Sequence, residues 1–103
     1  MRTQKETEYR TRILMEAYRA MIGNISVNMR KISLKWTDDD ITIRTYFSHE
    51  PIEEEEEMIS EIMTEIIAGL PNIKSCKEEC LYSDKPLHDL EPFGEVIFLR
   101  NED

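Results

Sequence analysis

The sequence predicts an α+β domain with the element order α-β-β-α-β-β, in which two helices pack on one face of a four-stranded antiparallel sheet. Apolar residues recur at helical spacing in two separate segments, and two alternating segments with a matching register lie between them. Two amphipathic helices need a common apolar surface, which one face of a sheet provides. The length of 103 residues suits one domain, so we expect residues 1–103 to form a single domain with a short flexible N-terminus and an acidic C-terminal tail.

The first helix is expected at about residues 5–23. Its apolar stripe is formed by Ile13, Leu14, Ala17, Tyr18 and Met21, which recur at helical spacing. Gly23 and Asn24 follow the last apolar position, where such residues commonly end a helix.

A β-hairpin is expected to follow, because residues 31–36 and 41–48 alternate between polar and apolar side chains on either side of a polar connection, 37–40. This loop length places Trp36 opposite Ile41 and Leu34 opposite Ile43, so that all four share one face. The other face is expected to be open to water or to a partner. That face carries Lys31, Lys35, Arg44 and Tyr46.

The second helix is expected at roughly residues 51–69, with Pro51 at its first position and an unbroken run of glutamates, 53–57, in its first turns. Its apolar stripe comprises Ile59, Ile62, Met63, Ile66, Ile67 and Leu70. The helical phase places Glu55 and Glu56 nearer the core. It directs the other three glutamates outward, namely Glu53, Glu54 and Glu57.

The last third is predicted to contain a strand at about 73–82, a loop at 83–95 and a closing strand at 95–100. Cys76 and Cys80 would lie about 13 Å apart on a strand that rises ~3.3 Å per residue, which is beyond the reach of a disulfide. No second Cys/His pair with zinc-ligand spacing follows them. We therefore expect two reduced cysteines, with one or both in the core, and no need for a metal.

No pattern typical of an enzyme is present, and neither catalysis nor a cofactor is expected. The three glycines are isolated, which excludes a Gly-rich phosphate loop, and no nucleophile motif surrounds a serine. His49 and His88 lie in predicted turns and are expected to be solvated. Asp38, Asp39 and Asp40 lack the alternation and glycine of a calcium loop, so turn chemistry is the better explanation.

The formal net charge is −9, and it is unevenly distributed. Residues 1–36 hold eight basic and three acidic side chains, whereas residues 37–103 hold five basic and nineteen acidic ones. An acidic chain is poorly suited to bind nucleic acid directly, and its surface suits a basic protein partner. No apolar run could span a membrane or act as a signal-peptide core, so a soluble, cytoplasmic protein is expected.

The expected partner-binding residues are acidic and exposed. They are Glu53, Glu54 and Glu57 on the second helix, with Asp38, Asp39 and Asp40 at the hairpin tip as a second patch. A solvated helix start explains the glutamate run about equally well. The basic sheet face could hold an anionic ligand, although cross-strand solubility is the simpler explanation. The oligomeric state is left open.

Three stretches resemble small bacterial immunity proteins of the contact-dependent growth inhibition type: residues 16–24, 43–51 and 63–68. The resemblance covers about residues 10–100 and implies a one-to-one complex that blocks a cognate toxin domain, often a nuclease. It carries over no particular binding residue. The alternative is a small non-enzymatic scaffold or ligand-binding module that uses the open sheet face, alone or as a homodimer.

Overall fold

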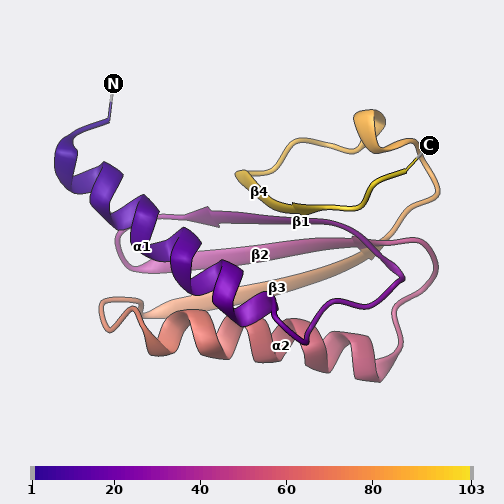
Figure 1. The fold of residues 1–103 in the computed structure, drawn as a ribbon, viewed down its shortest axis with the longest axis horizontal. Coiled ribbons are helices and arrows are strands. Elements are labelled where there is room, and N and C mark those ends of the chain that lie inside the picture. The colour runs from indigo at the N-terminus through magenta and orange to yellow at the C-terminus, as the bar shows by residue number, and fades with distance from the viewer. Residues whose placement is uncertain (1, 103) are drawn as a thin grey trace.

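The computed structural model describes residues 2–102. The elements follow in the order α1 (Gln4–Met21), β1 (Met29–Trp36), β2 (Asp40–Phe47), α2 (Glu53–Ala68), β3 (Ser75–Tyr82), the 3-10 helix η1 (Leu87–Asp89) and β4 (Glu95–Leu99) (Figure 1). The short η1 therefore interrupts the expected α-β-β-α-β-β order between the last two strands. Neither long helix is apolar enough over a sufficient length to cross a membrane.

The four strands form one mixed sheet in the order β3-β2-β1-β4. The hairpin β1–β2 and the pair β1–β4 are antiparallel, whereas β2 and β3 are parallel from Asp40–Ser75 to Phe47–Tyr82. The predicted purely antiparallel sheet is therefore wrong. The physical reason is the connection: α2 runs back along the sheet after β2, so β3 starts at the same end as β2 and must run parallel to it (Figure 1).

The predicted hairpin register is confirmed. Trp36 pairs with Ile41 and Leu34 with Ile43, and the helices pack on the face that these residues share. The buried apolar side chains of β1, β2 and both helices form one core cluster. It includes Ile13, Leu14, Ala17, Ile32, Leu34, Ile41, Ile43, Phe47, Ile59, Ile62, Met63 and Ile66.

The opposite sheet face is partly covered by the connection between β3 and β4, residues 83–94, which we call the strap. The centroid of the Phe93 ring lies 3.9 Å from the Arg44 guanidinium carbon, and Tyr46 is only 9% exposed. The expected open face is therefore wrong for Arg44 and Tyr46, whereas Lys35 is exposed and Lys31 is half-buried. Because β3 and β4 lie at opposite edges of the sheet and the helices occupy one face, their connection crosses the other face (Figure 1).

The helix starts differ from the sequence prediction. α1 begins with a capping box, in which the Glu6 N–H donates to Thr3 Oγ1 over 3.1 Å and the Thr3 N–H donates to the Glu6 carboxylate. α2 begins at Glu53 with Ile52 as its N-cap, so Pro51 lies outside the helix and the prediction for it is wrong. This shift leaves the position of the glutamate run at the start of α2 unchanged.

Candidate functional site

The outer side of α2 carries a row of exposed carboxylates. The opposite side of the helix is buried through Ile59, Ile62, Met63 and Ile66, and this packing directs the glutamates to solvent. We call the exposed row the α2 ridge. It comprises Glu53, Glu54, Glu57, Glu61 and Glu65. Among residues 2–102, no side-chain hydrogen bond or ion pair is made by a member of this ridge.

Sequence reasoning found three members of the α2 ridge and missed Glu61 and Glu65. Both follow Glu57 at successive intervals of four residues, which is the spacing of one helix face. That spacing was visible in the sequence, outside the unbroken run. The ridge therefore extends along most of α2, beyond its first turns.

Glu55 differs from the rest of the run because it is only 6% exposed. Its carboxylate accepts hydrogen bonds from Ser26 Oγ at 2.8 Å, the Ile52 N–H at 3.1 Å and Asn28 Nδ2 at 3.2 Å. Burial by itself would raise the pKa of Glu55, but these three donors together lower it. Glu55 thus faces inward as predicted and has a structural role, whereas Glu56 is exposed, contrary to the prediction.

The three aspartates of the hairpin tip lie at the far end of β2 from the start of α2 (Figure 1). Asp39 and Asp40 contact the start of β3: the Asp39 carbonyl accepts from the Lys74 N–H at 2.7 Å, and Asp40 Oδ1 accepts from Ser75 Oγ at 2.9 Å. β2 has eight residues and spans roughly 26 Å at ~3.3 Å per residue. The structure therefore does not bring the two predicted acidic patches together.

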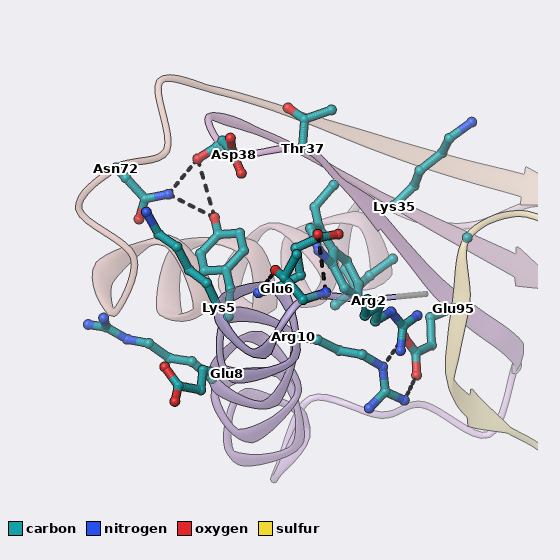
Figure 2. A pocket seen from close by; sticks show the side chains of 16 residues that line it. Arg2, Lys5, Glu6, Glu8, Arg10, Lys35, Thr37, Asp38, Asn72 and Glu95 are labelled. Atoms are coloured by element: carbon teal, nitrogen blue, oxygen red, sulfur yellow. Dashed lines mark hydrogen bonds and ion pairs between the residues drawn. The ribbon is translucent and has the colours of Figure 1, made fainter.

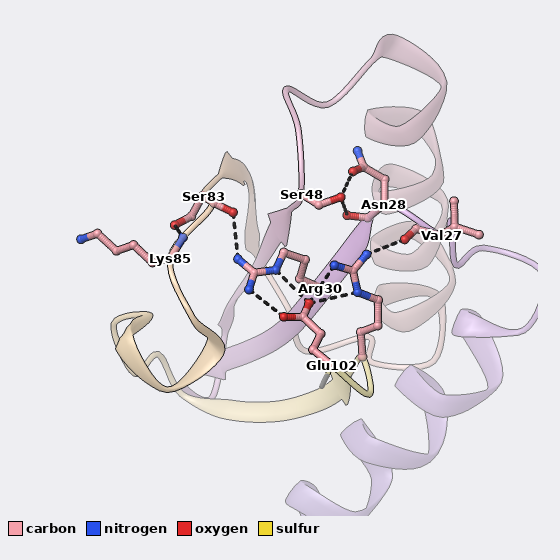
Figure 3. Close-up of polar contacts among 8 residues, drawn as sticks. Val27, Asn28, Arg30, Ser48, Ser83, Lys85 and Glu102 are labelled. Carbon is pink, nitrogen blue, oxygen red and sulfur yellow. Dashed lines mark hydrogen bonds and ion pairs between the residues drawn. The ribbon is translucent and has the colours of Figure 1, made fainter.

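Most arginines of the central sheet region are already paired with carboxylates. Arg44 Nε donates to Glu79 at 2.7 Å, and Arg10 forms an ion pair with Glu95. Arg30 and Arg100 both donate to the Glu102 carboxylate over 2.8–3.0 Å, and Figure 3 shows Arg30 beside Glu102. These pairs hold four of the thirteen basic side chains of the chain, whereas the carboxylates of the α2 ridge keep their negative charge.

A hollow on the surface lies between the first half of α1, the end of β1 and the start of β4 (Figure 2). Its cationic side chains are matched by nearly as many acidic ones. The cations are Arg2, Lys5, Arg10, Arg12 and Lys35, and the acids are Glu6, Glu8, Asp38 and Glu95. This balance favours neither an anionic nor a cationic ligand.

Both cysteines lie on β3 as free thiols: Cys76 is exposed, and Cys80 packs partly against the core. Burial, with Glu56, Glu78 and Glu55 nearby, raises the pKa of Cys80 to about 11. No group of three potential metal ligands is found within residues 2–102. His49 and His88 are both exposed, and His88 lies beside Asp89 at 3.4 Å.

A known protein family matches most of the chain. The family model described as MafI2 immunity protein matches residues 10–102, which is nearly the whole chain and includes every helix and strand except the first part of α1. The comparison with curated proteins finds no relative that matches.

Proposed function

Because the chain belongs to the MafI2 immunity protein family, we propose that it binds and neutralises a cognate bacterial toxin domain, a nuclease, through the acidic α2 ridge. The predicted resemblance to small bacterial immunity proteins is confirmed by the family match. Members of such families are in general inhibitors and not enzymes. The contact-dependent growth inhibition type, the nuclease activity of the toxin and the acidic interface are parts of the proposal.

The observation that carries this proposal is the unpaired charge of the α2 ridge. Its five carboxylates share one exposed side of a helix, while the arginines of the sheet region are held in ion pairs. A nuclease binds phosphates in a basic cleft, and an acidic helix can occupy such a cleft in their place. Opposite charge also accelerates encounter, which favours rapid capture of a toxin.

Asp38, Asp39 and Asp40 form the second patch of the proposal. Because they lie at the other end of β2, one toxin domain would contact both patches only if it extended along the sheet. The ridge is therefore the primary site, and the hairpin tip supplies a secondary contact.

The test replaces Glu53, Glu54 and Glu57 by glutamine, which keeps size and helix propensity and removes three charges. Folding should be retained, since such surface changes usually cost less than about 0.5 kcal/mol. Association with the cognate toxin domain should slow by about tenfold or more at low salt, and the rate should depend less steeply on ionic strength. Stopped-flow measurements over a salt series give both quantities.

The matched control removes three charges from the strap through Asp84→Asn, Asp89→Asn and Glu91→Gln, which are all exposed. It has the same net charge as the ridge variant and should keep nearly the original rate. If both variants bind alike, the α2 ridge is a solvated helix face and net charge alone steers the toxin.

The alternative function, a scaffold or ligand-binding module on an open sheet face, is left with a smaller surface because the strap covers part of that face. Ser33 is 2% exposed, and Arg44 lies under the Phe93 ring. Lys35, which lies beside the Phe93 ring, stays exposed and marks the part of this face that a ligand could still contact.

A further inference from the structure

Within residues 2–102, no strand covers the outer edge of β3, which is eight residues long. β3 pairs with β2 in a continuous parallel register, and the sheet ends there. The N–H groups of Ser75 and Ser83 donate to carbonyls at either end of β2, namely those of Asp39 and Phe47. Because hydrogen bonding alternates along a parallel strand, the N–H and C=O groups of the even-numbered residues, Cys76, Glu78, Cys80 and Tyr82, point away from β2.

The opposite edge of the sheet is protected in ways that β3 is not. β4 has only five residues, and its register with β1 shifts between Ile32 and Ser33, as at a β-bulge. β3 has no proline, its register has no shift, and six of its eight residues are exposed. Natural proteins usually shorten, bulge or cover such an edge, because it readily pairs with another chain.

The surroundings of this edge are acidic. Ser60 on α2 donates to the Glu78 carboxylate, which places that carboxylate on the helix side of β3. The raised pKa of Cys80 reflects burial first and then the nearby charges of Glu56, Glu78 and Glu55. Glu53 and Glu57 of the α2 ridge lie on the same helix, so negative charge continues from β3 onto α2.

We infer that β3 accepts an extended, basic segment of the cognate toxin domain as a fifth strand of the sheet. This inference rests on the proposed function and specifies how the toxin binds. The outward N–H and C=O groups of β3 would supply main-chain hydrogen bonds, and alternate side chains of the added strand would face the carboxylates of α2. A lysine or arginine at those positions would meet Glu56 and Glu78.

A second copy of this chain is the less suitable occupant of the same edge. Two β3 strands paired side by side would bring the carboxylates of both Glu78 residues and both α2 helices toward one another. Like charges placed close together oppose such pairing. The side chains of a basic segment would instead be attracted to these carboxylates.

The test is amide hydrogen exchange, followed by NMR, on the full chain alone and with a catalytically inactivated cognate toxin domain. In the free protein, the amides of Cys76, Glu78, Cys80 and Tyr82 should exchange rapidly, whereas those of the intervening residues are protected by β2. Complex formation should slow hydrogen exchange at these four outward amides at least tenfold. This alternating pattern distinguishes strand addition from simple coverage by the toxin.

Two variants at Glu78 provide a matched pair. Both Glu78→Ala and Glu78→Pro lose the carboxylate bonded by Ser60, but only proline removes the outward N–H and places a ring on the edge. We expect both variants to lose the charge contact of Glu78, and Glu78→Pro to bind the toxin at least tenfold more weakly than Glu78→Ala. Circular dichroism and thermal melting establish that each is folded. Should the proline variant fail to fold, hydrogen exchange on the unaltered chain decides.

The outcomes separate this inference from the proposed function. If the unaltered chain does not bind the toxin, both are overturned. If it binds while the four amides still exchange rapidly, and the two Glu78 variants bind alike, only strand addition is overturned. If the chain alone sediments as a dimer with those amides protected, the edge belongs to a second copy and the inference is wrong.

Discussion

Glu55 shows, at the residue scale, how one position in a uniform run acquires its own role. It is the N3 residue of α2, and its carboxylate accepts from the N–H of the N-cap residue Ile52. It also receives hydrogen bonds from Ser26 and Asn28, which precede β1, so it links the start of the helix to the start of the sheet. Its neighbour Glu56 is exposed and has no such contacts.

We predict that Glu55→Gln destabilises the protein by about 1–3 kcal/mol, because a neutral amide accepts three donors less well and buries unmatched N–H groups. Glu56→Gln is the matched control and should lie within about 0.5 kcal/mol of the original protein. Urea unfolding of the two variants measures the difference. Equal stabilities would mean that the buried carboxylate contributes nothing to the fold.

Glu102 is a second residue whose role the sequence does not reveal. Its carboxylate accepts from Arg30 Nε at 2.9 Å and Nη2 at 2.8 Å, and Arg30 Nη1 donates to the Ser83 carbonyl at 2.8 Å (Figure 3). Hydrogen bonding by Arg30, assisted by Arg100, lowers the pKa of Glu102 to about 2. This cluster ties the acidic tail to β1 and to the start of the strap.

The pH dependence follows from the sign of that shift. A carboxylate whose pKa is lower in the folded state adds stability above its ordinary value near 4.5, and this contribution is lost as the pH falls toward about 2. Glu102→Gln should therefore lower the melting temperature by several degrees at pH 7, since ~1 kcal/mol corresponds to roughly 4–8 °C in a domain of this size. The difference in melting temperature between Glu102→Gln and the original protein should narrow as the pH falls from 5 to 2. A difference that stays constant with pH would show that the charge of Glu102 does not cause the loss of stability.

At the element scale, the strap depends on a tight approach at its end. Gly94 has φ +56°, and a Cβ added there would lie 2.1 Å from the Leu34 carbonyl oxygen of the central strand β1. Gly23, after α1, has φ +82°, but an added Cβ would meet nothing within 4 Å. Substitution of Gly23 therefore measures the cost of the backbone conformation alone, whereas substitution of Gly94 adds the cost of a steric clash.

We predict that Gly23→Ala costs about 1 kcal/mol, the usual cost of a positive φ for a residue with a Cβ. Gly94→Ala adds a clash with backbone that cannot move without disturbing the sheet, so its melting temperature should fall at least twice as far. Differential scanning calorimetry of both variants tests this. Similar losses would mean that the strap shifts away from β1 at little cost.

On the scale of the whole molecule, the arrangement of the sheet decides which surfaces are available to a partner. The helices cover one face and the strap covers part of the other, whereas the outer side of the helices and the edge of β3 remain available to a partner (Figure 1). The unpaired acidic charge of α2 lies beside that edge. Within residues 2–102, the fold leaves two features of α2 and β3 free: carboxylates of the α2 ridge without side-chain partners, and main-chain groups of β3 without a neighbouring strand. The proposed interface combines these two features.

The sequence alone determined the features that depend on local periodicity. The hairpin register follows from the alternation on both sides of the connection at 37–40, and the buried side of α2 follows from the spacing of Ile59, Met63 and Ile66. Because outward positions are set by the same periodicity, the exposure of Glu53, Glu54 and Glu57 was predictable as well. Glu61 and Glu65 could have been added by the same reasoning.

Only the tertiary structure decided the features that depend on contacts between distant segments. The direction of β3 depends on where α2 returns the chain, and the burial of Tyr46 depends on the strap that crosses the sheet. Likewise, Glu55 and Glu102 receive their partners from residues 27 to 72 positions away along the chain, apart from the local Ile52 and Arg100 contacts. Local periodicity carries no information about such long-range contacts, because they form only when separate elements pack together.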